Sequence, residues 1–299
     1  MSGWNLLRLL LLAALWGGSF LFMRIVAPVL GAVPTSFLRV LLGAFGLWAI
    51  VLLMRVPLRY GGLFGRSMLL GALNSGLPFL LFSAAATVLP AGYSAILNAT
   101  TPLMAALIGY AAFGEKLDVV KVAGLLLGLA GVVVLTRAGP ASLDAALLAG
   151  VAACLLAAAC YGWAGFLTRR WITQRGGLDS RLVALGSQLG AVLLLGPLAA
   201  GQQLLQPVAW GNVPASVWAA LLALGLLCTA GAYVLYFQLI AEVGPLKAIS
   251  VTFLIPLFGV LWGGWLLDEP ITAAHAAGGS LIALALWCVL RPQPTRSPP

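Results

Sequence analysis

Ten apolar runs of about 20 to 26 residues follow one another along this chain, separated by short stretches that carry Pro, Gly or charge. A helix needs roughly 20 apolar residues to cross the hydrocarbon core of a bilayer. Charged residues make up only 8% of the chain, far below the quarter that is usual in soluble domains. The sequence therefore predicts an all-α integral membrane protein. The expected transmembrane helices cover residues 5–27, 34–54, 66–87, 91–112, 118–137, 144–169, 180–200, 214–238, 245–267 and 271–291.

The basic residues gather at one end of the expected spans. The net charge is +9, and thirteen of the sixteen Lys and Arg residues fall on the side of the N-terminus. Only Arg24, Arg39 and Arg137 fall on the other side. Because Lys and Arg accumulate on the cytoplasmic side of membrane proteins, we expect both termini in the cytoplasm. This role, together with contact to anionic lipid, accounts for the charge and excludes nucleic acid as a partner.

A weak internal repeat divides the chain into halves. An offset of 145 residues pairs Trp16-Gly17 with Tyr161-Gly162 early in each half. Later, an offset of 154 residues pairs Gly71 with Gly225, Pro102 with Pro256, Glu115 with Glu269 and Arg137 with Arg291. Five spans per half is an odd number, so the second half must enter the membrane upside down relative to the first. We predict five-helix repeats over residues 1–139 and 140–292, and a disordered Pro-rich tail over 293–299.

Several short motifs keep a recognisable order along the chain. They are Leu15-Trp16-Gly17-Gly18-Ser19-Phe20, Arg39, Pro102 followed by Gly114-Glu115-Lys116-Leu117, and Pro256 followed by Asp268-Glu269-Pro270. Over essentially its whole length the chain resembles the drug/metabolite transporter superfamily of the EamA type, and within it the YddG-type bacterial amino-acid exporters. The resemblance implies a multi-pass protein of the bacterial inner membrane that exports amino acids and related metabolites. It also implies a pathway lined by spans 1, 3, 4, 6, 8 and 9.

Polar side chains inside the expected spans are candidates for substrate contact. Ser94, Asn98 and Thr101 follow one another at i, i+4 and i+7, which places them on one face of a continuous helix. Asn74 lies inside the third span. Polar groups within a bilayer usually face the bundle interior or a cavity. They also serve as hydrogen-bonding contacts between helices, and the sequence leaves both roles open.

Aromatic residues form a second candidate set. Phe79 and Phe82 map by the offset of 154 onto Tyr233 and Tyr236, and each pair is spaced i, i+3. Symmetric placement favours a position near the axis between the halves, although lipid-facing or core packing is the alternative. The further aromatic candidates in spans one and six are Trp16, Phe20, Tyr161 and Trp163. Such rings can hold apolar or cationic parts of a substrate.

Three prolines interrupt expected helices and are candidates for gating: Pro78, Pro102 and Pro256. Proline removes a backbone hydrogen bond and kinks a helix, which can serve a hinge or simply shape the bundle. Arg39 is the one charge clearly inside a span. We expect it to extend to the outer headgroups; holding a substrate carboxylate or an interior partner is the alternative. Glycine pairs such as Gly124/Gly128 are expected to pack helices within one monomer.

These patterns favour a transporter that works by alternating access, not an enzyme. The sequence contains no phosphate-binding loop, no metal-ligand cluster and no nucleophile–base pair, so we expect no cofactor and no metal. All seven acidic residues lie near span ends, whereas proton relays use carboxylates inside the bundle. We therefore expect facilitated export of neutral or aromatic amino acids by a monomer. The alternatives are a proton-coupled drug or cation efflux protein of the same fold and an intramembrane lipid-modifying enzyme.

Overall fold

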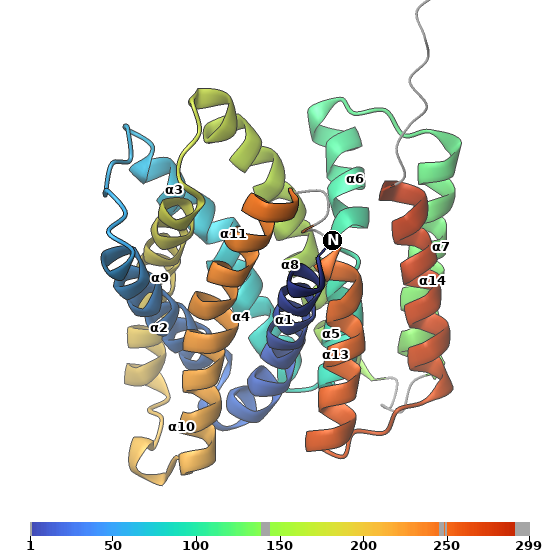
Figure 1. Cartoon of the computed structure of the whole chain (residues 1–299). Coiled ribbons are helices and arrows are strands. Elements are labelled where there is room, and N and C mark those ends of the chain that lie inside the picture. The colour runs from blue at the N-terminus through green and yellow to red at the C-terminus, as the bar shows by residue number, and fades with distance from the viewer. Residues whose placement is uncertain (1, 139–143, 245–247, 249, 291–299) are drawn as a thin grey trace, which may run out of the picture.

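The computed structural model describes residues 2–138, 144–244, 248 and 250–290. They form helices throughout and contain no strand. Figure 1 shows the helices side by side in one bundle. Their bounds are α1 Gly3–Leu30, α2 Ala32–Leu53, α3 Phe64–Gly71, η1 Ala72–Gly76, α4 Leu77–Ala86, α5 Ala91–Asn98, α6 Thr101–Phe113, α7 Val119–Ala138, α8 Ala145–Trp171, η2 Thr173–Arg175, α9 Ser180–Leu205, η3 Trp210–Asn212, α10 Ala215–Leu222, η4 Ala223–Gly231, α11 Ala232–Val243, α13 Val251–Leu266 and α14 Ala273–Leu290.

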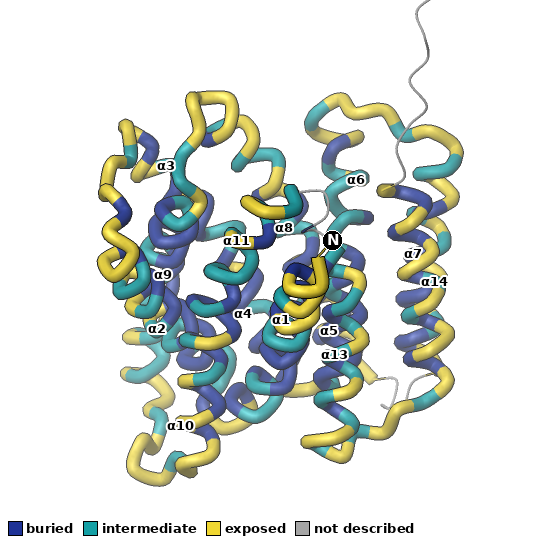
Figure 2. The backbone as a smooth tube through the Cα atoms, in the orientation of Figure 1, coloured by how far each residue is buried: buried dark blue, intermediate teal, exposed yellow. Residues whose placement is uncertain are grey.

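The predicted membrane helices are confirmed. Within the described ranges, nine helical segments are long and apolar enough to cross a bilayer, and Val251–Leu266 is a shorter apolar helix. The third span consists of α3, η1 and α4, the fourth of α5 and α6, and the eighth of α10, η4 and α11. The predicted tail and the boundary at residue 139 lie outside the described residues. Figure 2 shows buried backbone in the middle of the bundle and exposed backbone at the loops and outward faces.

Local chemistry explains where the long helices start. The Asp144 carboxylate accepts a hydrogen bond of 2.8 Å from the Leu147 amide, so α8 begins with a side-chain cap. Arg169 and Arg170 lie in its last turn, where positive charge favours the negative end of the helix dipole. The Asp179 carboxylate caps α9 in the same way through the Arg181 amide at 2.9 Å.

Two π-helical segments occupy equivalent places in the halves. The first, η1, lies in the third span, and the second, η4, lies in the eighth. The offset of 154 places residues 72–76 on 226–230, inside η4. Such wide turns are rare and are frequent at functional sites. The same offset pairs Ser75 with Thr229, so each segment carries a hydroxyl at the same position.

Each π-helical segment packs against the second helix of the opposite half. Segment η1 contacts α9, and η4 contacts α2. The paired glycines Gly71 and Gly225 make these crossings close. A Cβ atom on Gly71 would overlap the Ser187 carbonyl, and one on Gly225 would overlap Leu42. The repeat seen in the sequence is therefore also present in the packing of the halves.

Helices α7 and α14 pack along each other at one edge of the bundle (Figure 1). A Cβ atom on Gly124 would lie 2.9 Å from the Cβ of Cys288, and one on Gly131 would lie 2.9 Å from the Gly278 carbonyl oxygen. The glycine pairs Gly186/Gly190 and Gly259/Gly263 likewise face neighbouring elements of the same chain. The expectation that these glycines pack helices within one chain is confirmed.

The predicted proline pair does not break its two helices in the same way. Pro102 lies in the first turn of α6, directly after an interruption at residues 99–100. Pro256 lies inside α13, which continues from Val251 to Leu266. Pro78 lies in the first turn of α4, directly after η1. Pro102 and Pro256, which the repeat relates, therefore sit differently in their helices, because α6 has its proline in the first turn whereas α13 carries it internally. A role of the three prolines in gating stays a prediction.

Candidate substrate site between the halves

Arg39 lies inside the bundle, and the expectation that it extends to the headgroups is wrong. Its side chain is 5% exposed. The guanidinium carbon lies 3.6 Å from the centroid of the Phe79 ring, in cation–π geometry. Nε donates to the Thr229 hydroxyl at 3.2 Å, and an Nη atom lies 3.3 Å from the Met23 sulfur. The Phe79 ring and the Thr229 hydroxyl in η4 therefore hold the Arg39 side chain inside the bundle.

No acidic side chain neutralises this buried cation. All seven acidic residues of the chain lie in the described ranges, and the ion pairs there are Arg8–Glu242, Arg24–Glu269 and Arg181–Asp179. Tyr161, Cys228 and Tyr233 lie within electrostatic range of Arg39, and all three are neutral groups at physiological pH. A buried charge is costly unless it is paired, so this site favours an anion from outside the protein.

A second polar pair mirrors this one across the interface of the halves. Gln188 in α9 donates through Nε2 to the Ser75 hydroxyl of η1 at 3.0 Å. The amide oxygen Oε1 of Gln188 is buried and accepts no hydrogen bond from the described residues. A Cβ atom on Gly43 would lie 2.8 Å from Cγ2 of Thr229 and 3.4 Å from this oxygen. The two pairs therefore border the same glycine and form one polar cluster.

Tyr233 extends this cluster into η1. Its hydroxyl lies close to Ser75, Asn74 and Gln188. Its ring stacks on Phe237 at a centroid distance of 5.6 Å. Of the predicted site residues, Asn74, Phe79 and Tyr233 thus lie around the polar cluster.

Five of the six remaining predicted aromatic residues form a group beside it. Trp16 packs on Tyr236 at 5.2 Å between ring centroids. Phe20 meets Phe82 edge to face at 5.3 Å, and Phe82 stacks on Tyr161 at 6.2 Å. The aromatic residues of α1, α4, α8 and α11 therefore converge, as their symmetric placement predicts. Their role in binding stays a prediction.

Several of these side chains are only partly buried. Tyr161, Tyr233 and Tyr236 are half-buried, as are Trp16 and Asn74. Each therefore keeps some surface that a neighbouring molecule can contact.

Trp163 lies apart from this region, and no hydrogen bond or ring contact among the described residues joins Ser94, Asn98 or Thr101 to it. Trp163 is 40% exposed and packs edge to face on Phe113 at 5.8 Å. Ser94 is buried, with the Cys154 thiol 3.8 Å from its hydroxyl oxygen. The Thr101 hydroxyl donates to the Asn98 carbonyl at 2.7 Å. Because the helix is interrupted at residues 99–100, the predicted continuous stripe of Ser94, Asn98 and Thr101 is not formed.

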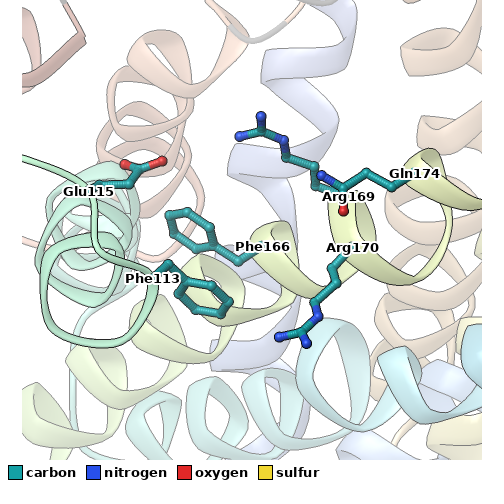
Figure 3. A pocket seen from close by; sticks show the side chains of 6 residues that line it. All are labelled: Phe113, Glu115, Phe166, Arg169, Arg170 and Gln174. Atoms are coloured by element: carbon teal, nitrogen blue, oxygen red, sulfur yellow. The ribbon is translucent and has the colours of Figure 1, made fainter.

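Two cavities open at the end of the bundle that the charge distribution predicts to be cytoplasmic. One, of about 200 Å³, is shown in Figure 3 and is lined by Phe113, Glu115, Phe166, Arg169, Arg170 and Gln174. The other, of about 410 Å³, lies between α9 and α11 near Met54 and Phe237. At its mouth a hydrogen bond of 2.6 Å from Arg181 lowers the pKa of Asp179. Neither cavity contains the predicted aromatic residues.

Gln188, Ser75 and Thr229 were missed by reasoning from sequence. A signal exists, because the offset of 154 relates Ser75 to Thr229 and an offset of 149 relates Arg39 to Gln188. Within the part of the chain that is described, no group of three or more His, Cys, Asp or Glu residues could hold a metal ion. The chemistry available here is hydrogen bonding, charge and aromatic contact, which suits recognition of a small polar molecule.

Ten apolar helices in two inverted halves, with polar and aromatic residues between them, define a membrane transporter of the inverted-repeat class. The model of the EamA-like transporter family matches residues 3–137 and 148–291. The chain therefore belongs to the EamA-like transporter family.

Relatives of known sequence are similar over nearly the whole chain. An uncharacterized transporter of Bacillus subtilis, YoaV, is 24% identical, with 94% of this chain and 95% of the relative covered. A protein of Salmonella typhimurium named as a probable amino-acid metabolite efflux pump is 26% identical, with 93% and 92% covered. A solved crystal structure matches 97% of each chain with a TM-score of 0.63 at 20% identity, which supports the fold.

Proposed function

We propose that this protein exports neutral or aromatic amino acids and related small metabolites across the bacterial inner membrane by alternating access. The observation that carries the proposal is the two buried polar contacts between the halves, Arg39 with Thr229 and Gln188 with Ser75. A buried cation without an acidic partner lies in one polar cluster with a buried amide oxygen that accepts no hydrogen bond from the described residues. The α-carboxylate and α-ammonium groups of an amino acid complement these two groups.

The aromatic group beside the cluster supports the proposed side-chain preference. Trp16, Tyr236, Phe20, Phe82 and Tyr161 offer ring faces and edges next to the polar residues. A neutral or aromatic substrate side chain gains apolar and ring contacts there. The Salmonella relative, which is named for amino-acid metabolite efflux, supports the same substrate class.

The position of the acidic residues supports transport without ion coupling. Proton-driven carriers bind and release protons at carboxylates or histidines within the pathway. Here Glu115, Asp118, Asp144, Asp179, Glu242, Asp268 and Glu269 all lie at helix ends or in connecting segments. A zwitterion carries no net charge, so the membrane potential acts little on it. The substrate's own gradient then drives export from the cell.

Transport by the purified full-length protein in liposomes tests this function. We expect saturable uptake of radiolabelled neutral or aromatic amino acids, and at least about tenfold less uptake of their carboxamides, which lack the anion that Arg39 binds. Arg39→Gln should lower amino-acid uptake by about tenfold or more. Arg137→Gln, at an exposed residue in the last turn of α7, should stay within about twofold.

Three outcomes would contradict the proposal. Transport of organic cations driven by a proton gradient, with no amino-acid transport, would favour a drug or cation efflux protein. Chemical modification of the liposome lipids would favour an intramembrane enzyme. Equal amino-acid uptake by Arg39→Gln and Arg137→Gln, at equal amounts of folded protein, would remove Arg39 from the site.

A further inference from the structure

Glu269 ties the two halves together at the end of the bundle opposite the cavities. Its carboxylate oxygens accept hydrogen bonds of 3.0 and 2.9 Å from the amide of Ala91, the first residue of α5. Nε of Arg24 lies 3.7 Å from the same carboxylate. Arg24 also donates to the carbonyls of Ala86 and Thr87 at 2.9 and 3.1 Å, at the end of α4. One acidic residue of the second half thus fastens α1, α4 and α5 of the first half.

The same turn recurs in the first half around Glu115. The Glu115 amide donates to the Gly109 carbonyl at 2.9 Å, and the Glu269 amide donates to the Gly263 carbonyl at 3.1 Å. The preceding residues, Gly114 and Asp268, both have positive φ, at 69° and 52°. The offset of 154 relates each member of one turn to its counterpart.

The partner of Glu269 has a counterpart too. The offset of 145, which relates Trp16-Gly17 to Tyr161-Gly162, places Arg24 on Arg169. Glu115 and Arg169 both line the 200 Å³ cavity, and Figure 3 shows Glu115 on the segment that follows α6 and Arg169 on α8, on either side of it. They form no ion pair in this structure, whereas Arg24 and Glu269 do. The Arg24–Glu269 pair is therefore closed at one end of the bundle, while the equivalent pair, Arg169 and Glu115, is open at the other end.

We propose that these pairs are two alternating latches, and that Glu115 and Arg169 close on each other when the Arg24–Glu269 pair opens. Inverted halves exchange conformations as the carrier passes between its two open states. The geometry of Glu269 in this state is therefore the geometry that Glu115 adopts in the other. The structure is then the state that is closed at the outer end and open to the cytoplasm. The inference rests on the alternating access of the proposed function.

Distances between two spin labels, measured by double electron–electron resonance, report the opening of the inner end. Cysteines at Val119 and Thr173, both exposed, carry the labels in a chain without its four native cysteines. Substrate is omitted, and the protein is full length in lipid. The ratio of the population at the short distance to the population at the long distance reports how often the inner end is closed.

Removing a charge from the inner pair and removing one from the outer pair should shift this ratio in opposite directions. We expect Glu115→Gln and Arg169→Gln to lower the closed fraction by about three- to tenfold, because the inner ion pair is lost. Glu269→Gln should raise it by a similar factor. Arg170→Gln is the matched control, since Arg170 lines the same cavity but has Ile25 as its counterpart.

Charge exchange distinguishes a latch from a general charge effect. Glu115→Arg and Arg169→Glu should each lower the closed fraction, and the double variant should restore it. Failure of the double variant to restore it, or equal distances in Glu115→Gln and Arg170→Gln, would overturn the latch. Unchanged distances with normal amino-acid uptake would reject the latch and leave the proposed function standing. Opposite shifts in a protein that transports no amino acid would support the latch and reject the substrate.

Discussion

Thr229 and Ser75 hold equivalent places in the two halves, and each accepts a hydrogen bond from the opposite half. Arg39 of the first half donates to Thr229 at 3.2 Å, and Gln188 of the second half donates to Ser75 at 3.0 Å. Both hydroxyls lie in π-helical segments, where the wider turn alters the direction of the side chains. The interface between the halves therefore contains two buried polar contacts related by the repeat.

Thr229→Val should destabilise the protein, because it removes the acceptor of a buried charged donor while keeping the side-chain shape. We expect a loss of about 1–3 kcal/mol in the free energy of unfolding and a matching fall in the thermal midpoint in detergent. Thr229→Ser should stay close to the wild type. Thr136→Val is the control, because the Thr136 hydroxyl bonds to the Val132 carbonyl of its own helix. Equal midpoints for the Val and Ser variants at position 229 would contradict this prediction.

Trp16→Ala should lower transport of aromatic amino acids by about tenfold, because Trp16 packs on Tyr236 inside the bundle. Trp210→Ala should change it by less than about twofold, since Trp210 is exposed, lies in the connection between α9 and α10, and packs on Trp218. Uptake into proteoliposomes, divided by the amount of folded protein, gives the comparison. A larger loss at Trp210 than at Trp16 would show that the aromatic group does not contact substrate. Trp163→Ala compares the two readings of Trp163. A loss of transport would support its place among the aromatic candidates, whereas unchanged transport would agree with its packing on Phe113 outside this group.

Gly131→Ala should destabilise the pair α7 and α14. An added methyl group would lie 2.8 Å from Cγ1 of Ile282 and 2.9 Å from the Gly278 carbonyl oxygen, a backbone atom that cannot turn away as a side chain can. Overpacking of this kind costs about 1–3 kcal/mol. Gly165→Ala is the matched helical control, because its Cβ would meet no atom within 4 Å. Thermal midpoints in detergent should fall for the first variant and stay level or rise slightly for the second.

The orientation of the chain can be checked by chemical labelling. With thirteen basic residues on one side against three, we expect Gly61→Cys and Gln174→Cys to react with an impermeant thiol reagent only from the cytoplasm. Gln203→Cys, near the opposite end of α9, should react only from outside. Labelling of position 61 in intact cells would invalidate the predicted topology.

Most of the fold could be predicted from the sequence because membrane helices are specified by length and hydrophobicity alone. The repeat was also visible, since prolines and glutamates recur at one offset. The interruption at residues 99–100 and the π-helical segments were not predicted. They depend on packing between the halves, and periodic patterns assume an uninterrupted helix.

The candidate site was predicted in part. Trp16, Phe82, Tyr161 and Tyr236, which the repeat singles out, do make ring contacts with one another in pairs, and their contact with substrate stays a prediction. The position of Arg39 was predicted wrongly, because hydropathy does not say which face of α2 meets Phe79 and η4. Gln188 is a single polar residue in an apolar span, and only its contact with Ser75 reveals its place in the cluster.

The most direct test of facilitated amino-acid transport is counterflow and net uptake in proteoliposomes, with and without an imposed pH gradient. All seven carboxylates lie at helix ends or in connecting segments, and this placement motivates transport that follows the substrate gradient alone. We predict rapid counterflow of a radiolabelled neutral or aromatic amino acid. The final accumulation should be equal with and without the pH gradient. Concentrative uptake that appears only with the proton gradient, and collapses when an uncoupler is added, would contradict this account.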